Sequence, residues 1–173
     1  MAGRLESGEI DLVFVYETLI PGTPNHARLF AQPAHVLLAA DDPFADRPAI
    51  RLADLVSRDM ILLDSPPSSQ HTLSLFHDLG LQPKIRHRVG SYEVVRTLVA
   101  RGLGYGVLVQ RPHNPASYEG YPLVMKEIEP PVAPVAVEII WTADVPVNAR
   151  VRALIEFALA VPRWGDTRSV REQ

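Results

Sequence analysis

The pattern of apolar and polar positions is clearest between Gly90 and Arg111. Apolar residues recur there at the spacing of one helix face, at Val94, Val95, Leu98 and Val99. This stripe predicts an amphipathic helix that packs against a core. Ser91 stands where a hydroxyl caps the first turn, and Glu93 where the helix dipole favours a negative charge. Two cations are expected to stay off the stripe, Arg96 and Arg101.

The same stretch continues into a turn and a strand. Gly102 follows the last apolar turn, as helix C-termini often require, and the run from Tyr105 to Val109 is of strand type. The glycines at 102, 104 and 106 resemble a nucleotide-binding loop in spacing only. A dinucleotide fingerprint follows a strand and opens a helix, whereas these glycines follow a helix and open a strand, so we exclude it.

Short apolar runs predict strands elsewhere in the chain, at Ile10–Tyr16, His35–Ala40, Met60–Leu63, Leu123–Ile128 and Val135–Trp141. The first of these is almost continuously apolar, which is typical of a strand buried on both faces of a parallel sheet. Lys84–Val89 alternates charged and apolar residues and predicts a half-buried strand.

Three further segments predict helices. Arg51–Val56 is short, and a helix over about residues 70–79 is expected to bury Leu73, Phe76 and Leu79 before Gly80 ends it. The last helix is expected to begin near Asp144–Pro146 and to end at Pro162. Its apolar stripe follows helical spacing through Val151, Leu154, Ile155, Ala158 and Leu159. The polar residues 163–173 are expected to form a flexible tail.

Strands that alternate with helices predict an α/β fold with largely parallel pairing. Two segments rich in turn-forming residues, Asp41–Pro48 and Arg111–Gly120, are expected to be crossovers. They flank the block from Ala49 to Val109, which suggests an inner lobe inserted into an outer one.

Composition narrows the class of protein. The 173 residues suffice for one domain or two small lobes, and 47% of them are hydrophobic, enough for a core. The net charge of −3 argues against nucleic-acid binding by the whole chain. Cysteine is absent, and no apolar run approaches the length of a membrane span. The first five residues do not form a signal peptide, so we expect a cytoplasmic protein without membrane contact.

The strongest candidate for ligand contact is the start of the helix after the third strand. Pro66 lies in the turn before it, and Ser68, Ser69, Gln70 and His71 open it. Amides at a helix N-terminus favour an anion such as a carboxylate. This turn follows the carboxyl end of a strand, where α/β sheets bind ligands. Two interpretations stay open, capping by Ser68 or Ser69 alone and capping together with ligand contact.

Two other turns are weaker candidates. Glu17 and Thr18 follow the first strand and either face the same ligand or lie in a solvated loop. Leu103, Gly104 and Tyr105 lead into the strand at 105–109, and the glycine there allows close approach of a ligand or tight packing of helix on strand.

Other chemistry finds little support in the sequence. Six histidines are scattered, at His26, His35, His71, His77, His87 and His113. None has the spacing of a metal site, and only His71 lies near the candidate turn. The chain lacks a nucleophile elbow and a phosphate-binding loop. We therefore expect no catalytic residues, no metal and no cofactor.

Four segments in order resemble one family. Gly8–Leu12 resembles its "G-e-l-D-l" pattern, and Asp42–Ala45 its "h-P-l-a" turn, with Asp42 where histidine is common. Asp64–Pro83 resembles the strand, turn and helix that face the effector, and 90–109 resembles the helix, glycine turn and strand that follow. Together they resemble the effector-binding domain of LysR-type transcriptional regulators, over roughly Leu5 to Phe157.

The resemblance implies a two-lobed fold like that of type II periplasmic binding proteins, with a ligand cleft between the lobes. On this basis residues 1–44 and 113–162 form a partial outer lobe and residues 45–112 the inserted inner lobe. The outer lobe is expected to be incomplete at its N-terminus. The family's helix-turn-helix domain and linker helix have no counterpart in this sequence, so we expect a truncated regulator that does not itself contact DNA.

Three functions follow as hypotheses. The first is a sensor that binds a small organic anion, a carboxylate, and couples it to transcription control. The second is a stand-alone solute-binding protein, or a subunit that pairs with a full-length regulator or with itself. An enzyme on the same fold is the third, and it is disfavoured because no nucleophile–base pair is present.

Overall fold

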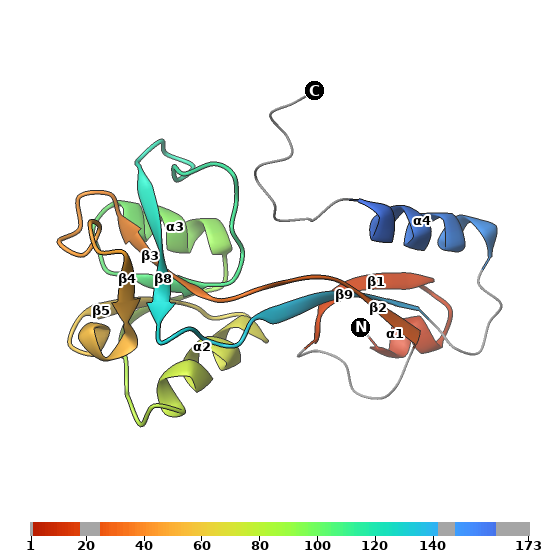
Figure 1. Cartoon of the computed structure of the whole chain (residues 1–173), viewed down its shortest axis with the longest axis horizontal. Helices are drawn as coiled ribbons and strands as arrows, with labels where there is room; N and C mark the ends of the chain where they lie inside the picture. Colours follow the sequence, from red (N-terminus) through yellow and green to blue (C-terminus); the bar gives the residue numbers. More distant parts are fainter. Residues whose placement is uncertain (1, 18–24, 142–147, 162–173) are drawn as a thin grey trace. The chain divides into compact units, whose positions relative to one another are not determined.

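The computed structural model describes residues 2–17, 25–141 and 148–161, in two compact units. Unit 1 comprises residues 1–32 and 134–173, and unit 2 comprises Pro33–Ala133. The predicted tail at 163–173 and the expected start of the last helix at 144–146 lie outside the described residues. Figure 1 shows the order of the elements along the chain.

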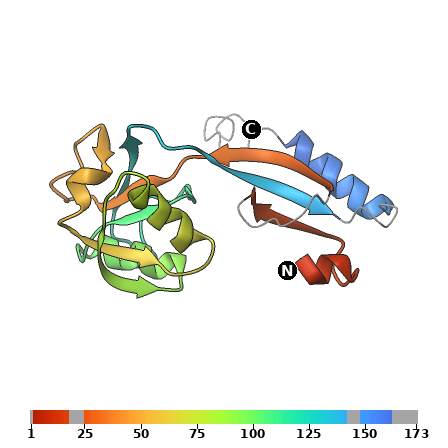
Figure 2. The ribbon, with the colours of Figure 1, turned by 90° about the horizontal axis from the view of Figure 1, so that it is seen from below.

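Unit 1 is a small antiparallel sheet with a helix on each side (Figure 2). Its strands are β1 (Leu12–Tyr16), β2 (Asn25–Gln32) and β9 (Val135–Trp141), in the order β1-β9-β2. Side chains alternate between the faces of the central strand β9. Ile139 packs with α4 (Ala149–Ala160), and Ile140 packs with Leu5 of α1 (Ala2–Glu6).

The first and last predicted elements are less buried than expected. β1 is an antiparallel edge strand, not a buried parallel one, and its Phe14 is 47% exposed. Helix α4 begins at Ala149, where the Asn148 side chain accepts bonds from the amides of Arg150 and Val151. It buries a narrower stripe than predicted, since Leu154 and Leu159 are exposed.

Unit 2 is built on six strands. β4 (Ala49–Arg51), β8 (Leu123–Glu129), β3 (His35–Ala39) and β7 (Gly106–Leu108) form one sheet in that order. β5 (Asp59–Leu63) and β6 (Lys84–Val89) form a parallel pair. A parallel bridge from Met60 to Tyr105 joins the pair to β7. The helical elements are η2 (Leu52–Leu55), α2 (Ser68–His77) and α3 (Tyr92–Ala100).

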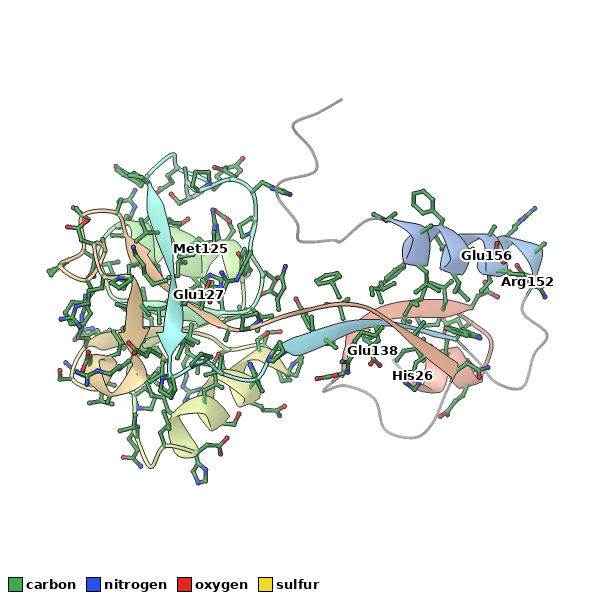
Figure 3. The ribbon with its side chains drawn as sticks, viewed as in Figure 1. His26, Met125, Glu127, Glu138, Arg152 and Glu156 are labelled. Atoms are coloured by element: carbon green, nitrogen blue, oxygen red, sulfur yellow. The ribbon has the colours of Figure 1, made fainter. Side chains whose placement is uncertain are left out.

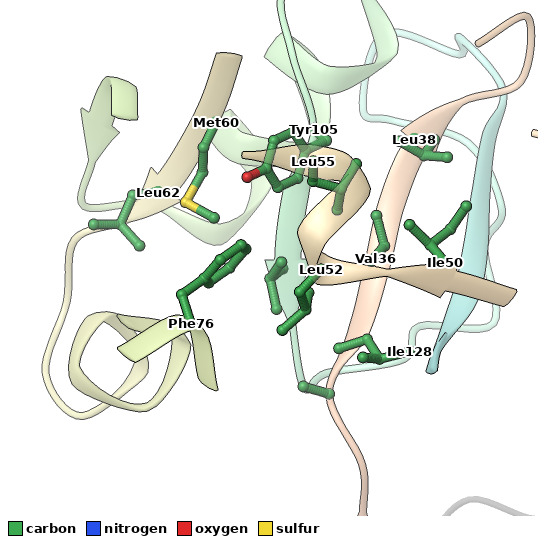
Figure 4. Close-up of a cluster of buried hydrophobic side chains, with 12 residues drawn as sticks. Val36, Leu38, Ile50, Leu52, Leu55, Met60, Leu62, Phe76, Tyr105 and Ile128 are labelled. Carbon is green, nitrogen blue, oxygen red and sulfur yellow. The ribbon is translucent and has the colours of Figure 1, made fainter. Parts of the chain in front are cut away.

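The core of unit 2 lies between these strands and α2. Phe76 of α2, Met60 of β5 and Tyr105 are fully buried in one cluster with Leu52 and Leu55 of η2 (Figure 4). Leu79, which we expected to be buried, lies beyond the end of α2 and is 51% exposed. The predicted helix at 51–56 is a single 3₁₀ turn preceded by the short strand β4.

The prediction of largely parallel pairing is wrong. Among the strands that the structure describes, β5–β6 and β4–β8 are the parallel ladders, whereas β1–β9, β2–β9, β3–β7 and β3–β8 are antiparallel. Apolar runs show that a strand is buried, but they carry no information about the direction of its neighbours. Strand β3 is buried along its whole length between two antiparallel partners, and its sequence therefore looks like that of a parallel strand.

The unit boundaries also differ from the lobe boundaries predicted at 44/45 and 112/113. The chain passes between the units at 32/33 and 133/134, so the expected crossovers Asp41–Pro48 and Arg111–Gly120 both lie inside unit 2. Asp42 forms an ion pair with Arg58, and Arg47 stacks on Phe44 at 3.6 Å. Turn-forming residues predicted the loops correctly, but not the side-chain contacts that hold them within the unit.

Helix α3 corrects two predictions about its polar residues. Ser91 is the N-cap, yet its side chain accepts no capping bond. Arg96 is only 3% exposed, and its guanidinium donates to the carbonyls of Asn114 (2.9 Å) and Ala116 (2.5 Å). The apolar stripe therefore shifts around the helix, burying Val95 and Val99 while Val94 stays 44% exposed. Within the described residues, no helix is long and apolar enough to cross a membrane.

Gly104 holds the β5 strand against the start of β7, and we expect Gly104→Ala to lower the free energy of unfolding by about 2 kcal/mol or more. A Cβ at this position would lie 2.3 Å from the Asp59 carbonyl oxygen. The φ angle of Gly104, +152°, is also unfavourable for alanine.

Urea unfolding measures this loss. Gly90→Ala is the matched control, because a Cβ at position 90 meets nothing within 4 Å. This variant should change the free energy of unfolding by no more than about 0.5 kcal/mol. Equal stability of the two variants would contradict the close packing of Gly104 against the Asp59 backbone.

Candidate functional site

The carboxyl ends of three strands in unit 2 meet at one edge. β5 and β6 are parallel, and the Met60–Tyr105 bridge runs parallel as well, so β7 points the same way. Helix α2 follows β5 and helix α3 follows β6, which places both helix N-termini at this edge. Ligands of α/β sheets bind beyond the carboxyl ends of strands, and helix N-termini there favour anions.

The first turn of α2 differs from the predicted cap. Pro67 is the N-cap, and its side chain offers no acceptor to the first-turn amides. Ser68 and Ser69 lie inside the helix and are not its cap. The amides of Ser69 and His71 reach the carbonyls of Ser65 (3.3 Å) and Pro67 (3.0 Å). The amides of Ser68 and Gln70 have no acceptor among the described residues, which leaves two donors at the positive end of the helix dipole.

The side chains of this turn offer several polar groups. Pro66 and Gln70 are exposed, Ser68 and His71 are half-buried, and Ser69 is buried. Burial lowers the pKa of His71, which favours the neutral imidazole, and its Nε2 has no partner in the described part of the chain. One residue further on, Thr72 donates to the Val107 carbonyl at 3.2 Å and thereby fixes α2 against β7.

Sequence reasoning missed the residues that surround the end of β7. The Tyr92 hydroxyl donates to the Gln110 carbonyl at 3.0 Å. Arg111 holds Glu127 of β8, which Figure 3 labels, through two bonds of 2.6 and 3.1 Å. Arg111 also reaches the Pro33 carbonyl at 3.4 Å. The available signal was a cation shortly after an apolar strand, because such a position lies near the carboxyl edge of the sheet.

His35, at the start of β3, lies next to this cluster. It pairs with Leu108 of β7 on one side and with Glu127 of β8 on the other. Its side chain is fully buried, and neither ring nitrogen has a hydrogen-bond partner in the regions described. Burial lowers the pKa of His35 to about 3, and the positive charges of Arg111 and Arg96 add to the effect. The residue is therefore neutral throughout the physiological range.

Leu103, Gly104 and Tyr105 lie at the opposite end of β5. The Tyr105 amide donates to the Asp59 carbonyl at 3.0 Å, and the Ile61 amide donates to the Tyr105 carbonyl at 2.8 Å. These residues therefore join the start of β5 to the start of β7, while Ser68–His71 follow the other end of β5. The close approach of Gly104 to the Asp59 backbone matches the packing interpretation of this turn.

The last two predicted contact residues belong to unit 1. Glu17 forms an ion pair with Arg28 at 3.0 Å, and Arg28 lies 3.9 Å from Glu138 of β9, labelled in Figure 3. Thr18 lies outside the described residues. Within those residues, no group of three or more metal-binding side chains comes together.

This arrangement of strands and helices matches a known family. A family model described as "LysR substrate binding domain" matches residues 1–163. The chain belongs to this family. The C-terminal domain of a "probable LysR family transcriptional regulator" from Rhodococcus sp. RHA1 is 37% identical with a TM-score of 0.87, covering 92% of this chain and 78% of that one. The LysR fold is two-lobed and resembles that of periplasmic binding proteins.

Curated relatives of this LysR domain are regulators. The small neutral protease regulatory protein of Streptomyces coelicolor is 33% identical over 109 residues, 57% of this chain and 32% of that protein. YnfL of Escherichia coli, an uncharacterized HTH-type transcriptional regulator, is 27% identical over 66% of this chain. The matched parts span 38% and 32% of the two relatives. The chain is therefore an effector-binding domain of a transcriptional-regulator family, which is not an enzyme class.

His35 predicts how stability depends on pH. In the folded domain its pKa is about 3, whereas the ordinary value is 6.5. Between these values the unfolded chain binds the extra proton, so stability is complete above pH 6.5 and falls as the pH drops toward 3. The slope is about 1.4 kcal/mol per pH unit.

Urea unfolding between pH 7 and pH 4 measures this slope. His35→Phe should flatten the dependence of the free energy of unfolding on pH. His71→Gln should reduce the slope by less, because His71 is only half-buried. A slope unchanged by His35→Phe would contradict a neutral, buried His35.

Proposed function

We propose that this domain senses a small organic anion, a carboxylate, which binds at the first turn of α2. The two free amides of Ser68 and Gln70, at the edge where β5, β6 and β7 end, are the observation that carries the proposal. Ser68, Ser69 and His71 supply hydroxyl and imidazole groups beside these amides. Together they offer a carboxylate several donors. The Asp64 carboxylate, in the same loop, is paired with Arg88 at 3.4 Å.

Structural neighbours support the size and chemistry of the ligand. The BenM effector-binding domain is described with benzoate, and that of QuiR with shikimate, at TM-scores of 0.72 and 0.75 and at 21% and 22% identity. At this identity the likeness establishes the fold alone. Because both of those ligands are small carboxylates, we extend the class of ligand to this chain without specifying the compound.

Binding is proposed to shift the domain between two states and so to influence transcription. A regulator that acts on DNA works in the cytoplasm, and we propose that location for this chain. The alternative is a stand-alone solute-binding protein, or a subunit that pairs with a full-length regulator. Copurification with a longer LysR-type regulator would favour the pairing subunit.

Gln70→Glu tests the site with minimal change of shape. The added carboxylate should repel an anionic ligand and weaken binding by about fivefold, since one charge at close range is worth about 1 kcal/mol. The same charge favours the helix N-terminus, so the folded domain should not lose stability. Calorimetric titration with a panel of small carboxylates, including benzoate and shikimate, measures the affinity.

Gln82→Glu adds an equal charge at an exposed position of unit 2 and should leave binding unchanged. Gln70→Lys should bind the anion at least as tightly as the unchanged chain. The double variant Ser68→Ala/Ser69→Ala should weaken binding if the hydroxyls contribute. Equal affinity of Gln70→Glu and Gln82→Glu, or no binding from the whole panel, would refute an anion site at α2.

A further inference from the structure

The two points at which the chain joins unit 2 adjoin neighbouring strands of one sheet. The chain enters the unit at Pro33, just before β3, and leaves it at Ala133, after β8. These strands form an antiparallel ladder, and the last pair of that ladder toward the two connections is His35–Glu127. The ladder between β3 and β7 ends at the same residue, with the pair His35–Leu108. The backbone at Pro33 therefore lies beyond both ladders of β3.

Arg111 spans this open end of the sheet. Its guanidinium donates to the two carboxylate oxygens of Glu127, at 2.6 and 3.1 Å, and to the Pro33 carbonyl at 3.4 Å. A planar guanidinium presents several donors in a fixed fork, which suits a carboxylate and a further acceptor at the same time. A single side chain thus connects the entry point of the chain to the strand that leads toward its exit.

Burial distinguishes this contact from an ordinary surface ion pair. The Arg111 side chain is only 24% exposed, although that of Glu127 is 57% exposed. Exposed pairs contribute little, because water and salt compete for both charges. Water has less access to Arg111, and the Pro33 carbonyl supplies a further acceptor. Arg101 and Glu119 form a matched pair elsewhere in unit 2, with bonds of 2.7 and 2.8 Å but with the Arg101 side chain 51% exposed.

The two strands do not depend on Arg111 equally. On its other side β8 pairs with β4 in parallel register as far as Glu129, two residues beyond Glu127. In the described sheet β3 has no such continuation, since its pairing with both neighbours stops at His35. Removing the Arg111 contact should therefore loosen the entry strand more than β8.

We propose that Arg111 is a clasp that keeps the entry strand closed against its neighbours and sets how often residues 33–36 open locally. When the guanidinium leaves Glu127 and Pro33, the end of β3 is held by its ladder and its core contacts alone. Segments that open locally at low free energy are the ones available for conformational change. This role concerns the free chain and does not depend on an anion site at α2.

Hydrogen exchange of the full 173-residue chain tests the clasp. Arg111→Gln removes the charge and the fork but leaves a polar side chain. Amides of residues 34–36 should exchange about tenfold faster in this variant, because a hydrogen bond to a charged group is stronger than one between neutral groups. Amides of residues 117–121, which lie outside the opening segment, should keep their rates. Unchanged exchange at residues 34–36 would overturn the proposal.

Urea distinguishes local opening from global unfolding. Exchange at residues 34–36 should depend weakly on urea in both chains, because local opening exposes little surface. Exchange at Met60–Leu62, in the buried strand β5, should depend on urea strongly. The same urea dependence at both places would show that residues 34–36 open only together with the whole unit, and a local clasp would then be excluded.

Two further variants separate the clasp from a general effect of losing a cation. Arg101→Gln removes the matched pair with Glu119, which holds no ladder end, and should leave exchange at residues 34–36 unchanged. Glu127→Gln tests the same contact as Arg111→Gln from an exposed position and should also accelerate these amides.

The double variant Arg111→Gln/Glu127→Gln completes the test. It should exchange no faster than Arg111→Gln alone, because the two residues act through one contact. Additive effects in the double variant, or equal acceleration by Arg101→Gln, would each overturn the proposal.

Discussion

The organisation of unit 2 depends on a close backbone contact between Gly104 and Asp59. Two hydrogen bonds flank this contact, from the Tyr105 amide to Asp59 and from the Ile61 amide to Tyr105. They connect the parallel pair β5–β6 to the sheet that contains β7, and they do so in parallel register. Because of this connection the carboxyl ends of three strands and the starts of two helices share one edge. A side chain at position 104 would prevent the approach.

Two cations, buried Arg96 and half-buried Arg111, fix the segment between β7 and β8. Arg96 lies inside the unit and holds the carbonyls of Asn114 and Ala116, while Arg111 holds Glu127 and the Pro33 carbonyl. Each guanidinium has several donors in a plane and can hold two acceptors at once. His35 lies close enough to both for their charges to lower its pKa, and it therefore serves the core as a neutral group.

The sequence was most informative where the apolar pattern was long and ended by glycine. Residues 90–111 gave helix, turn and strand in the observed order, because Val95 and Val99 face the core and Gly102 adopts a φ of +74°. The sequence analysis did not predict β2. Ala27, Leu29 and Ala31 alternate there with other residues, but alanine is too weakly hydrophobic to make the alternation of apolar and polar positions clear. It also failed for Arg96, whose burial depends on carbonyls about 20 residues away.

The candidate site was predictable in part for the same reason. The start of α2 follows an apolar strand, which places Ser68–His71 at the carboxyl edge from local order alone. Leu103–Tyr105 also adjoin a strand, but they precede it, and so they lie at the other end of the sheet. Arg111 and Tyr92 act through partners distant in sequence, Glu127 and Gln110. Spacing along the chain does not contain that information.

The two units differ in how much apolar surface they enclose. Counting only residues that the structure describes, unit 2 has a cluster of twelve buried residues and a second of seven, whereas the clusters on the two faces of the unit 1 sheet have four and three. Burial of apolar area is the main favourable term in folding, so unit 1 gains less from its own contacts. Its central strand β9 is apolar on both faces, yet α1 is a helix of only five residues. Among the described residues, the buried apolar area of unit 1 is therefore divided between two small clusters on opposite faces of one sheet, which limits what either face contributes to stability.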